Sequence, residues 1–377
     1  VDISPDMSVA EMPVGYKQFI EIAREIDRSK TRLLFLDEPT AVLTETEAQI
    51  LLTALKKLAE SGIGIIFISH RLQEVKELCD RIVVLRDGEV IREADAGSAS
   101  VRDIASWMVG RHVEEHGEER HERVRSDSAA LAVEHLWVDM PGETVRDVSF
   151  EVRKGEIFGI GGLAGHGKLG IPNGIMGLYP SGGEVRLFGK SIPLNAPRNA
   201  LDSRMAFVSE DRRGVGLLLD ERIDWNITFT AMQVQNRFLK KIPLLGIRLR
   251  DDRAISREAE RYIEALDIKC TGPGQRAAEL SGGNQQKVCL AKAFALQPEV
   301  LLVCEPTRGI DIGAKTLVLD TLRRHNEEHG TTIVVTSSEL EELRSICDRI
   351  AIVGEGRIAG VLPAASPAEE FGLLMMG

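Results

Sequence analysis

The chain repeats itself over a long period. Residues 62–93 realign with residues 330–360, and Cys79 in the first segment corresponds to Cys347 in the second, 268 positions later. Two upstream segments keep the same order at nearly the same offset: residues 32–40 with 299–307, and residues 12–23 with 280–291. A period of this length is much too long for a solenoid repeat, so the pattern indicates a duplicated domain.

The two copies differ in how much of the domain they contain. The second has residues 130–298 ahead of its 299–307 segment, whereas the first has only residues 1–31 ahead of the equivalent one. We therefore expect the chain to begin partway through its first domain, with that copy's own phosphate-binding loop lying upstream. The predicted organisation is the C-terminal part of a first domain (1–111), a charged linker (112–129) and a second domain (130–377).

Composition narrows the function classes. The 377 residues carry a formal net charge of −11, which argues against a general nucleic-acid-binding surface. No apolar run approaches the roughly 18 residues of a membrane span. The five cysteines are scattered and form no C-x-x-C pair, a pattern typical of reduced thiols in the cytoplasm. Any membrane role therefore has to come through a partner.

Apolar runs rich in β-branched residues alternate with stretches of helical spacing. Runs such as LLFLD, GIIFIS, RIVVLRDG, VLLVCE and TIVVTS predict buried parallel strands. Intervening stretches such as TEAQILLTALKKLAES and LEELRSIC predict helices. This alternation predicts an α/β fold with a mainly parallel sheet flanked by helices.

A glycine-rich stretch at 161–170, GGLAGHGKLG, contains the pattern Gly162-x-x-x-x-Gly167-Lys168. A strand-like run precedes it and a helix-like run follows. In that context backbone N–H groups face phosphates and Lys168 reaches the terminal ones, although the glycines alone are also compatible with a simple turn. Leu169 stands where a Ser or Thr hydroxyl normally holds Mg²⁺. We expect the loop to hold phosphate but to hold the metal poorly.

The segment LSGGNQQ at 280–286 is the most specific motif in the chain. Together with VLLVCEP at 300–306 and GIDIGAK at 309–315, it resembles the signature of ABC ATPases. The resemblance covers nearly the whole chain, and the tandem arrangement is similar to the ATP-binding subunits of simple-sugar ABC importers. Further matching stretches are MVGR (108–111), DVSFEVRKGEIFGIGGLAGHGK (147–168), VSEDRRGVGLLLDERIDWNI (208–227) and EPTRGIDIGAK (305–315).

This resemblance implies a P-loop NTPase of the ABC type, with helical and antiparallel β subdomains beside the parallel sheet. It implies an ATPase that uses ATP and Mg²⁺ to energise uptake of a monosaccharide or a nucleoside-like solute, bound peripherally at the cytoplasmic side of the membrane. The implied partners are transmembrane permease subunits and, indirectly, a periplasmic or extracellular solute-binding protein, with no nucleic acid. The alternative is a soluble tandem ABC protein acting on ribosomes, although such proteins usually have two intact sites and a longer, basic linker.

In this family two domains pair head to tail, and each ATP lies between the phosphate loop of one and the signature of the other. One composite site would combine the first copy's loop with the second copy's signature. There Asp37 would organise Mg²⁺, Glu38 would act as general base and His70 would reach the γ-phosphate. The signature residues expected at the nucleotide are Ser281, Gly282, Gly283 and Gln285. Because the first loop is not in the chain, we expect the chain alone not to hydrolyse ATP.

The other composite site is altered at nearly every position. The changes are Leu169 at the Mg²⁺ hydroxyl, Cys304 at the equivalent of Asp37, Ser338 at the equivalent of His70, and Pro13 and Val14 at the equivalents of Ser281 and Gly282. Only Glu305 remains as a candidate base, so we expect no hydrolysis there. The loop residues can still retain nucleotide: Gly162, Gly165, His166, Gly167, Lys168 and Leu169.

Two further residues are weaker candidates. Glu210 lies where ABC domains usually carry a Gln that senses Mg²⁺ and the permease. The importer family that this chain resembles has Glu at this position. Residues 212–226 would then face the membrane partner, with an ordinary surface loop as the alternative. Trp137 is the nearby aromatic that could stack on adenine, but it comes slightly early in the chain, so a core tryptophan is favoured.

Overall fold

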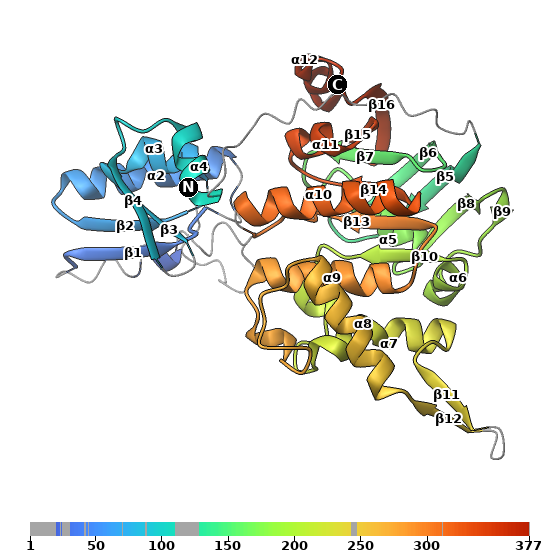
Figure 1. Ribbon diagram of the computed structural model, residues 1–377. Helices are drawn as coiled ribbons and strands as arrows, with labels where there is room; N and C mark the ends of the chain where they lie inside the picture. Colours follow the sequence, from blue (N-terminus) through green and yellow to red (C-terminus); the bar gives the residue numbers. More distant parts are fainter. Residues whose placement is uncertain are drawn as a thin grey trace. The chain divides into compact units, whose positions relative to one another are not determined.

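The computed structural model describes residues 20–22, 24, 31–40, 43, 45–69, 71–86, 89–109, 128–242, 247–310 and 312–376. The chain divides into two compact units, the first of residues 1–120 with 311–313 and the second of residues 121–310 and 314–377 (Figure 1). Most of the predicted linker at 112–129 lies outside the described residues. Within the described part, no helix combines the length and the apolar character needed to cross a bilayer.

The second unit is built on a ten-stranded sheet with the order β10-β13-β14-β7-β15-β16-β6-β5-β8-β9. Five neighbouring strands run parallel: β10 (Met205–Val208), β13 (Val300–Cys304), β14 (Thr332–Thr336), β7 (Ile157–Gly162) and β15 (Arg349–Gly354). The others pair mainly antiparallel: β16 (Arg357–Pro363), β6 (Val145–Arg153), β5 (Ala129–Val138), β8 (Ser181–Leu187) and β9 (Lys190–Ser191). The predicted parallel sheet with an antiparallel β subdomain is confirmed.

Side chains along the parallel strands alternate between two hydrophobic cores. On β13, Leu301 and Val303 belong to one core, and Val300 and Leu302 belong to the other. The first core also takes residues from α9 (Gly282–Ala295), α10 (Ile312–His329), α11 (Leu340–Ile346) and α12 (Ala368–Met376). The second takes residues from α5 (Gly170–Ile175), α6 (Pro197–Asp202) and the antiparallel strands. Because both faces are covered, the strands read as continuous apolar runs.

A helical subdomain adjoins the sheet. It contains α7 (Ile223–Gln235), α8 (Asp252–Ala265) and the antiparallel hairpin of β11 (Leu239–Ile242) and β12 (Ile247–Arg250), with α7 packed on α8 and α9. The helical subdomain implied by the family resemblance is therefore present.

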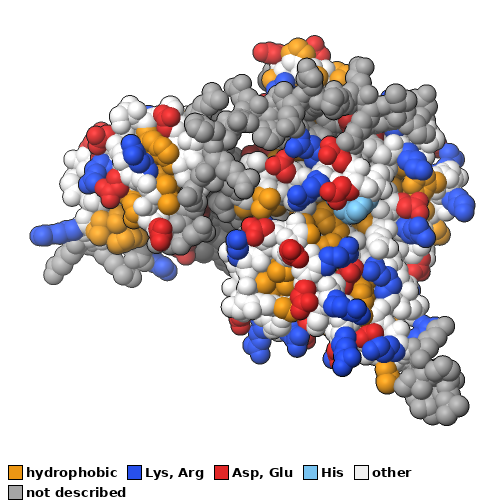
Figure 2. All heavy atoms as spheres, in the orientation of Figure 1, with side chains coloured by type: hydrophobic (Ala, Val, Ile, Leu, Met, Phe, Trp, Pro, Cys, Tyr) orange, Lys and Arg blue, Asp and Glu red, His pale blue; other side chains and the backbone are white. Residues whose placement is uncertain are grey.

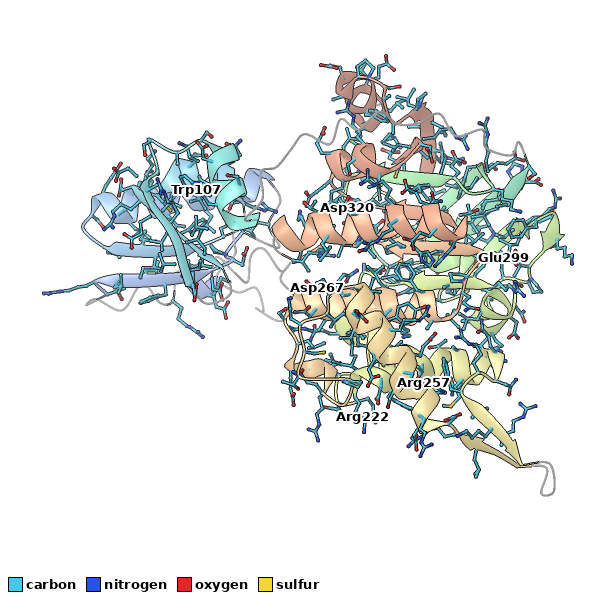
Figure 3. All side chains as sticks on the ribbon, viewed as in Figure 1. Trp107, Arg222, Arg257, Asp267, Glu299 and Asp320 are labelled. Atoms are coloured by element: carbon cyan, nitrogen blue, oxygen red, sulfur yellow. The ribbon has the colours of Figure 1, made fainter. Side chains whose placement is uncertain are left out.

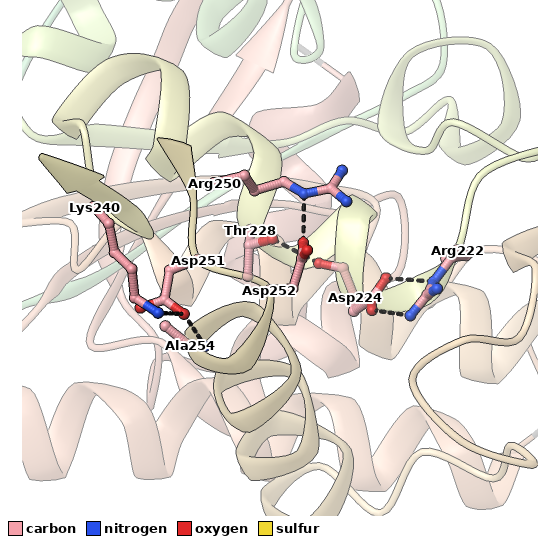
Figure 4. A network of polar contacts seen from close by, with 8 residues as sticks. All are labelled: Arg222, Asp224, Thr228, Lys240, Arg250, Asp251, Asp252 and Ala254. Atoms are coloured by element: carbon pink, nitrogen blue, oxygen red, sulfur yellow. Dashed lines mark hydrogen bonds and ion pairs between the residues drawn. The ribbon is translucent and has the colours of Figure 1, made fainter. Parts of the chain in front are cut away.

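Polar contacts hold the helix starts of this subdomain in place (Figure 4). Arg222 donates two hydrogen bonds to Asp224, which is only 4% exposed. Asp251 caps α8 by accepting a hydrogen bond from the backbone N–H of Ala254. Lys240 on the hairpin pairs with the same aspartate, their charged atoms 3.0 Å apart. The hairpin is thereby joined to the N-terminus of α8.

The first unit repeats elements of the second. Its strands are β1 (Leu33–Asp37), β2 (Gly64–Ile68), β3 (Arg81–Arg86) and β4 (Glu89–Asp95), and its helices include α2 (Glu45–Glu60), α3 (Leu72–Leu78) and α4 (Val101–Val109). The repeat extends to single hydrogen bonds. The Thr40 hydroxyl donates to Glu74 at 2.6 Å, and the equivalent Thr307 hydroxyl donates to Glu342 at 2.5 Å. The duplication inferred from the sequence therefore reaches the level of individual contacts.

The sheets of the two units differ in what covers them. In the first unit Leu34 and Leu36 pack under α2, matching one face of the second unit's sheet. On the opposite face Phe35 is 65% exposed, whereas its counterpart in the second unit, Leu302, is fully buried. Figure 2 shows hydrophobic side chains at the surface of the first unit. The described part of that unit has no counterpart of α5 or of the antiparallel strands that cover this face in the second unit.

The prediction of buried parallel strands is therefore wrong for part of the first unit. β1 and β2 pair parallel, but their residues alternate between buried or half-buried and more exposed positions. β3 pairs antiparallel with β4, whereas its equivalent, β15, also has a parallel neighbour in β7. The apolar pattern of these strands is typical of a sheet covered on both faces, but the described residues of this unit cover only one face.

A buried imidazole predicts a pH dependence of stability. His325 on α10 stacks on Phe294 with ring centroids 3.8 Å apart, and burial, followed by the nearby His329, lowers its pKa to about 4. An unfolded histidine titrates near pH 6.5, so between about pH 6.5 and 4 the unfolded chain binds a proton that the folded protein does not. Stability should therefore fall by about 2 kcal/mol between pH 7 and pH 5 through this residue.

Urea unfolding at the two pH values, with His325→Gln beside the parent protein, measures this effect. The variant should lose most of that acid sensitivity. The exposed His135 is the matched control, and His135→Gln should keep it. Equal acid sensitivity in all three proteins would contradict the assignment.

Candidate nucleotide-binding site

One edge of the second unit's sheet carries its candidate nucleotide-binding residues, which come from the phosphate loop and from the ends of neighbouring strands. The phosphate loop, residues 162–169, follows β7, the strand between β14 and β15. Glu305 follows β13, Ser338 lies just beyond β14, and Glu210 lies just beyond β10. Because these strands are parallel, their carboxyl ends share one edge, where α/β folds commonly bind ligands. Candidates from four strands are thus brought together.

Two glycines allow the loop to pass close to neighbouring backbone. Gly162 has a φ of 151°, and a Cβ there would lie 2.4 Å from the Val353 carbonyl oxygen. Gly167 has a φ of 96°, and a Cβ there would lie 2.7 Å from the Thr144 carbonyl oxygen. A side chain at either position would be strained and would collide with main chain. The loop is therefore pressed against β15 on one side and against the turn before β6 on the other.

The loop's backbone N–H groups donate to a carboxylate of the chain itself. Glu143, in the turn before β6, accepts hydrogen bonds from the N–H groups of Gly165 at 2.8 Å, Gly167 at 2.9 Å and Leu169 at 3.2 Å. The Glu143 side chain is buried. These are N–H groups of the loop that we expected to face phosphate. Sequence reasoning missed Glu143, which lies 22 to 26 positions from its partners and belongs to no motif.

Lys168 is also engaged within the chain. Its side chain is 1% exposed, and its Nζ lies 3.8 Å from Oε1 of Glu305, which is itself buried. The Ser338 hydroxyl donates to the same carboxylate oxygen at 2.6 Å. The lysine expected at the terminal phosphates is therefore paired with the candidate base, and Ser338 orients that base.

Cys304 lies at the end of β13, beside the carboxylates of Glu210 and Glu305. Burial, followed by the negative charge of Glu210, raises the pKa of its thiol well above the usual range. The thiol therefore stays neutral at physiological pH. Glu210 also accepts a long hydrogen bond, 3.5 Å, from the side-chain amide of Asn173 on α5. Glu210 thus lies beside Cys304 and Asn173 at this edge of the sheet.

The donor set of this site does not fit Mg²⁺, which prefers oxygen ligands in octahedral geometry. Cys304 offers a neutral thiol in place of a carboxylate. Leu169 offers no hydroxyl, and its side chain belongs to the hydrophobic core with Ile171 and Ile175. Among the described residues, no group of three or more His, Cys, Asp or Glu side chains could hold a metal ion.

The signature residues lie at the start of α9. Ser281 is the exposed N-cap, and Gly282 and Gly283 are the first two residues of the helix. The first N–H groups of a helix have no partner within it, so this end can receive an anion. The Ser281 hydroxyl accepts a hydrogen bond from the side chain of Asn284 at 3.0 Å, which holds it at the helix end. These three residues therefore lie together at the N-terminus of α9.

Gln285 does not belong to that group. Its side chain is 2% exposed, and its amide donates to the Ala277 carbonyl oxygen at 3.1 Å. We therefore do not retain Gln285 as a nucleotide-binding residue, because its side chain is buried and its amide nitrogen is bonded inside its own domain. His166 remains in the loop, where its carbonyl oxygen accepts a hydrogen bond from Gly356 at 2.9 Å.

In the first unit, Asp37 ends β1 with an exposed side chain, and Glu38 follows it. Glu38 and Glu305 share the same backbone form, with φ of 48° and 44°. Each donates its N–H to the carbonyl of the neighbouring strand at 2.8 Å. The two copies therefore hold the candidate base alike and differ in the side chains around it. His70, Pro13 and Val14 lie outside the described residues.

Trp137 is not a core residue, and the interpretation favoured from the sequence is wrong. Its side chain is 47% exposed at the end of β5. The indole lies directly over Gly182 on β8, where a Cβ would come within 2.4 Å of the ring nitrogen. The glycine leaves room for the ring on the surface of the antiparallel sheet, so the large side chain is supported without being enclosed.

Comparison with known proteins assigns the family. The family model described as ABC transporter matches residues 145–308. A ribose import ATP-binding protein from Rhizobium meliloti (strain 1021) is 41% identical over 373 residues, which cover 98% of this chain and 69% of the relative. The chain belongs to the ribose-import type of ABC transporter ATP-binding proteins.

Other relatives of this type agree. A ribose import ATP-binding protein from Clostridium tetani is 36% identical, with 97% of this chain and 70% of the relative covered. A putative ribose/galactose/methyl galactoside import ATP-binding protein from Agrobacterium fabrum is 37% identical, with 98% and 71% covered. The chain spans about 70% of the length of these ABC proteins.

Solved structures support the fold. A dimeric bacterial ABC transporter cassette matches with a TM-score of 0.52 and 20% identity, over 63% of this chain and all of the cassette. A cassette from Clostridium perfringens, part of an ABC transporter complex, matches with a TM-score of 0.51 and 20% identity, over 65% of this chain and 92% of its own. At this identity the likeness establishes the ABC-type P-loop fold.

The close contact at Gly167 predicts a large cost for a methyl group there. Gly167→Ala places a Cβ against the Thr144 carbonyl at a positive φ, so we expect a loss of at least ~2 kcal/mol in the free energy of unfolding, measured by chemical denaturation. Gly372→Ala on α12 is the matched control, because nothing lies within 4 Å of its Cβ and alanine favours helix. A similar stability for both variants would show that the loop is loosely held.

Proposed function

We propose that this protein is an ATP-hydrolysing subunit of an importer that takes up a ribose-type monosaccharide or a nucleoside-like solute. The relatives named as ribose import proteins support the solute class. In this proposal one composite site hydrolyses ATP and the other does not. The contrast between Asp37, an exposed carboxylate after one strand, and Cys304, a neutral buried thiol at the equivalent point, supports that division most directly.

At the hydrolytic site, Glu38 would accept the proton of the attacking water, because its carboxylate follows the strand end in a constrained backbone conformation. Asp37 would hold Mg²⁺, which supplies charge stabilisation for the transferred phosphoryl group. Ser281 and the first N–H groups of α9 would bind the γ-phosphate. His70 would contact the same phosphate.

The second site lacks the metal-binding groups that would support the same hydrolysis of ATP. Glu305 is held by Lys168 and Ser338, and neither a carboxylate nor a hydroxyl stands at the metal positions. A water there would have a base but no metal to offset the developing charge. We therefore assign to this site nucleotide binding without hydrolysis.

A pair of equivalent substitutions tests this division in the assembled importer. Glu38→Gln keeps the size of the side chain but removes the base, so ATP turnover should fall by about 10²-fold or more. Glu305→Gln is the matched control at the equivalent position and should retain most of the turnover. Phosphate release by the transporter reconstituted with its permease measures both. The proposal of one hydrolytic site fails if Glu305→Gln is as damaging as Glu38→Gln.

Residues 212–226 have the properties of a surface that contacts the permease. The π-helical turn Arg212–Gly216 and the residues after it carry exposed apolar side chains, with Val215 56% and Leu218 48% exposed. The Arg212 guanidinium donates to the Gly282 carbonyl at 3.0 Å. Figure 3 shows Arg222 on the outer side of the helical subdomain. A displacement of α9, the helix that begins at the signature residues, would therefore be transmitted to this segment through Arg212.

Placing a charge among the exposed apolar side chains of this segment should uncouple the subunit from its partner. We expect Val215→Glu to leave the folded structure intact and to reduce permease-stimulated ATP turnover at least tenfold, because a buried unpaired charge disfavours an apolar interface. Leu249→Glu on β12 is the control, since Leu249 is similarly exposed at 51% but lies outside the segment. Equal coupling in the two variants would place the permease contact elsewhere.

A further inference from the structure

We propose that Glu143 is an internal anion that competes with nucleotide phosphate for the loop of the second unit, and so sets the affinity of that site. The proposal rests on the proposed function, in which this loop is a nucleotide site. It begins from the three hydrogen bonds that the N–H groups of Gly165, Gly167 and Leu169 donate to this one carboxylate.

These donors are the ones a phosphate group would use. A loop of this kind binds phosphate through consecutive backbone N–H groups that converge on one anion. Oε1 of Glu143 accepts from Gly165, and Oε2 accepts from Gly167 and Leu169, so both carboxylate oxygens are engaged. A phosphate and the carboxylate cannot hold the same N–H groups together. Nucleotide binding in the loop therefore requires Glu143 to leave it.

The ammonium group of Lys168 in the loop is also paired within the chain. Lys168 Nζ lies 3.8 Å from the Glu305 carboxylate, with both side chains buried. Glu210 adds a further carboxylate beside Cys304 in the same site. A nucleotide phosphate entering the loop would meet these carboxylates at close range, where low solvent exposure strengthens repulsion. Removing the charge of Glu143 weakens its hold on the three donors and removes one repelling group, and removing its side-chain acceptor frees all three donors.

The seating of Glu143 is built by the fold. The turn that carries it presses on the start of α5, directly after the loop, since a Cβ at Gly170 would lie 2.2 Å from the Glu143 carbonyl oxygen. The Glu143 side chain is buried, as are two of its partners, Gly167 and Leu169. Glu143 therefore contacts this region through both its backbone and its side chain, unlike an exposed carboxylate that makes a single surface hydrogen bond.

Binding of mant-ADP to the purified 377-residue protein tests the proposal. We expect Glu143→Gln to bind mant-ADP about tenfold more tightly than the parent. This is the difference in affinity expected when the charged acceptor of the loop N–H groups is replaced by a neutral one. Glu143→Ala, which removes the acceptor altogether, should show at least the same gain. Mant-adenosine has no phosphate, so its affinity should not change. Glu151→Gln, an exposed residue on β6, is the control for loss of one negative charge.

Adding Lys168→Ala to Glu143→Gln should remove the gain, because the gain must arise at this loop. Unfolding by urea, with and without ADP, separates competition from a purely structural role. If Glu143 only braces the loop, Glu143→Gln will lose stability and bind mant-ADP no better, and the proposal is overturned. Absence of mant-ADP binding in every variant also overturns it. Either failure leaves the hydrolytic assignment untouched, since that depends on the comparison of Glu38→Gln with Glu305→Gln.

Discussion

Burial of both faces of the parallel sheet is the constraint on which the second unit depends. Successive residues of β13 belong to two different cores, so neither face can be exposed without loss of apolar packing. Covering both faces requires crossover helices, which make the strands parallel and bring their carboxyl ends to one edge. The loop after β7 and the residues after β13, β14 and β10 meet there for that reason. The site is a consequence of how the sheet is covered.

Duplication shows which features belong to the backbone and which to the side chains. Glu38 and Glu305 keep a similar positive φ and equivalent backbone hydrogen bonds, and the hydroxyls of Thr40 and Thr307 donate to equivalent glutamates. The side chains that give this framework its chemistry have changed between the copies. A carboxylate at one strand end has become a thiol that burial keeps protonated at the other. Backbone geometry is thus retained where the metal-binding donors are not.

Charge in the second site is balanced inside the chain. The loop N–H groups meet Glu143, and the ammonium of Lys168 meets Glu305. The backbone N–H groups and the lysine of the phosphate-binding loop therefore both have anionic partners within the chain. Buried partial and full positive charges are costly unless paired, so these carboxylates stabilise the loop in its folded form. The same pairing determines what a nucleotide has to displace.

The sequence by itself determined the fold class, the duplication, the loop at 162–169 and the group at Ser281, Gly282 and Gly283. The fold class, the loop and the signature group depend on apolar periodicity and on short motifs, and the duplication depends on segments that recur about 268 positions apart. Only the tertiary structure decided that Glu143 enters the loop, that Gln285 turns inward and that Trp137 lies at the surface. Each of these depends on a contact between elements distant in sequence, and no local pattern records which donor meets which acceptor when a sheet edge, a turn and a helix end are brought together.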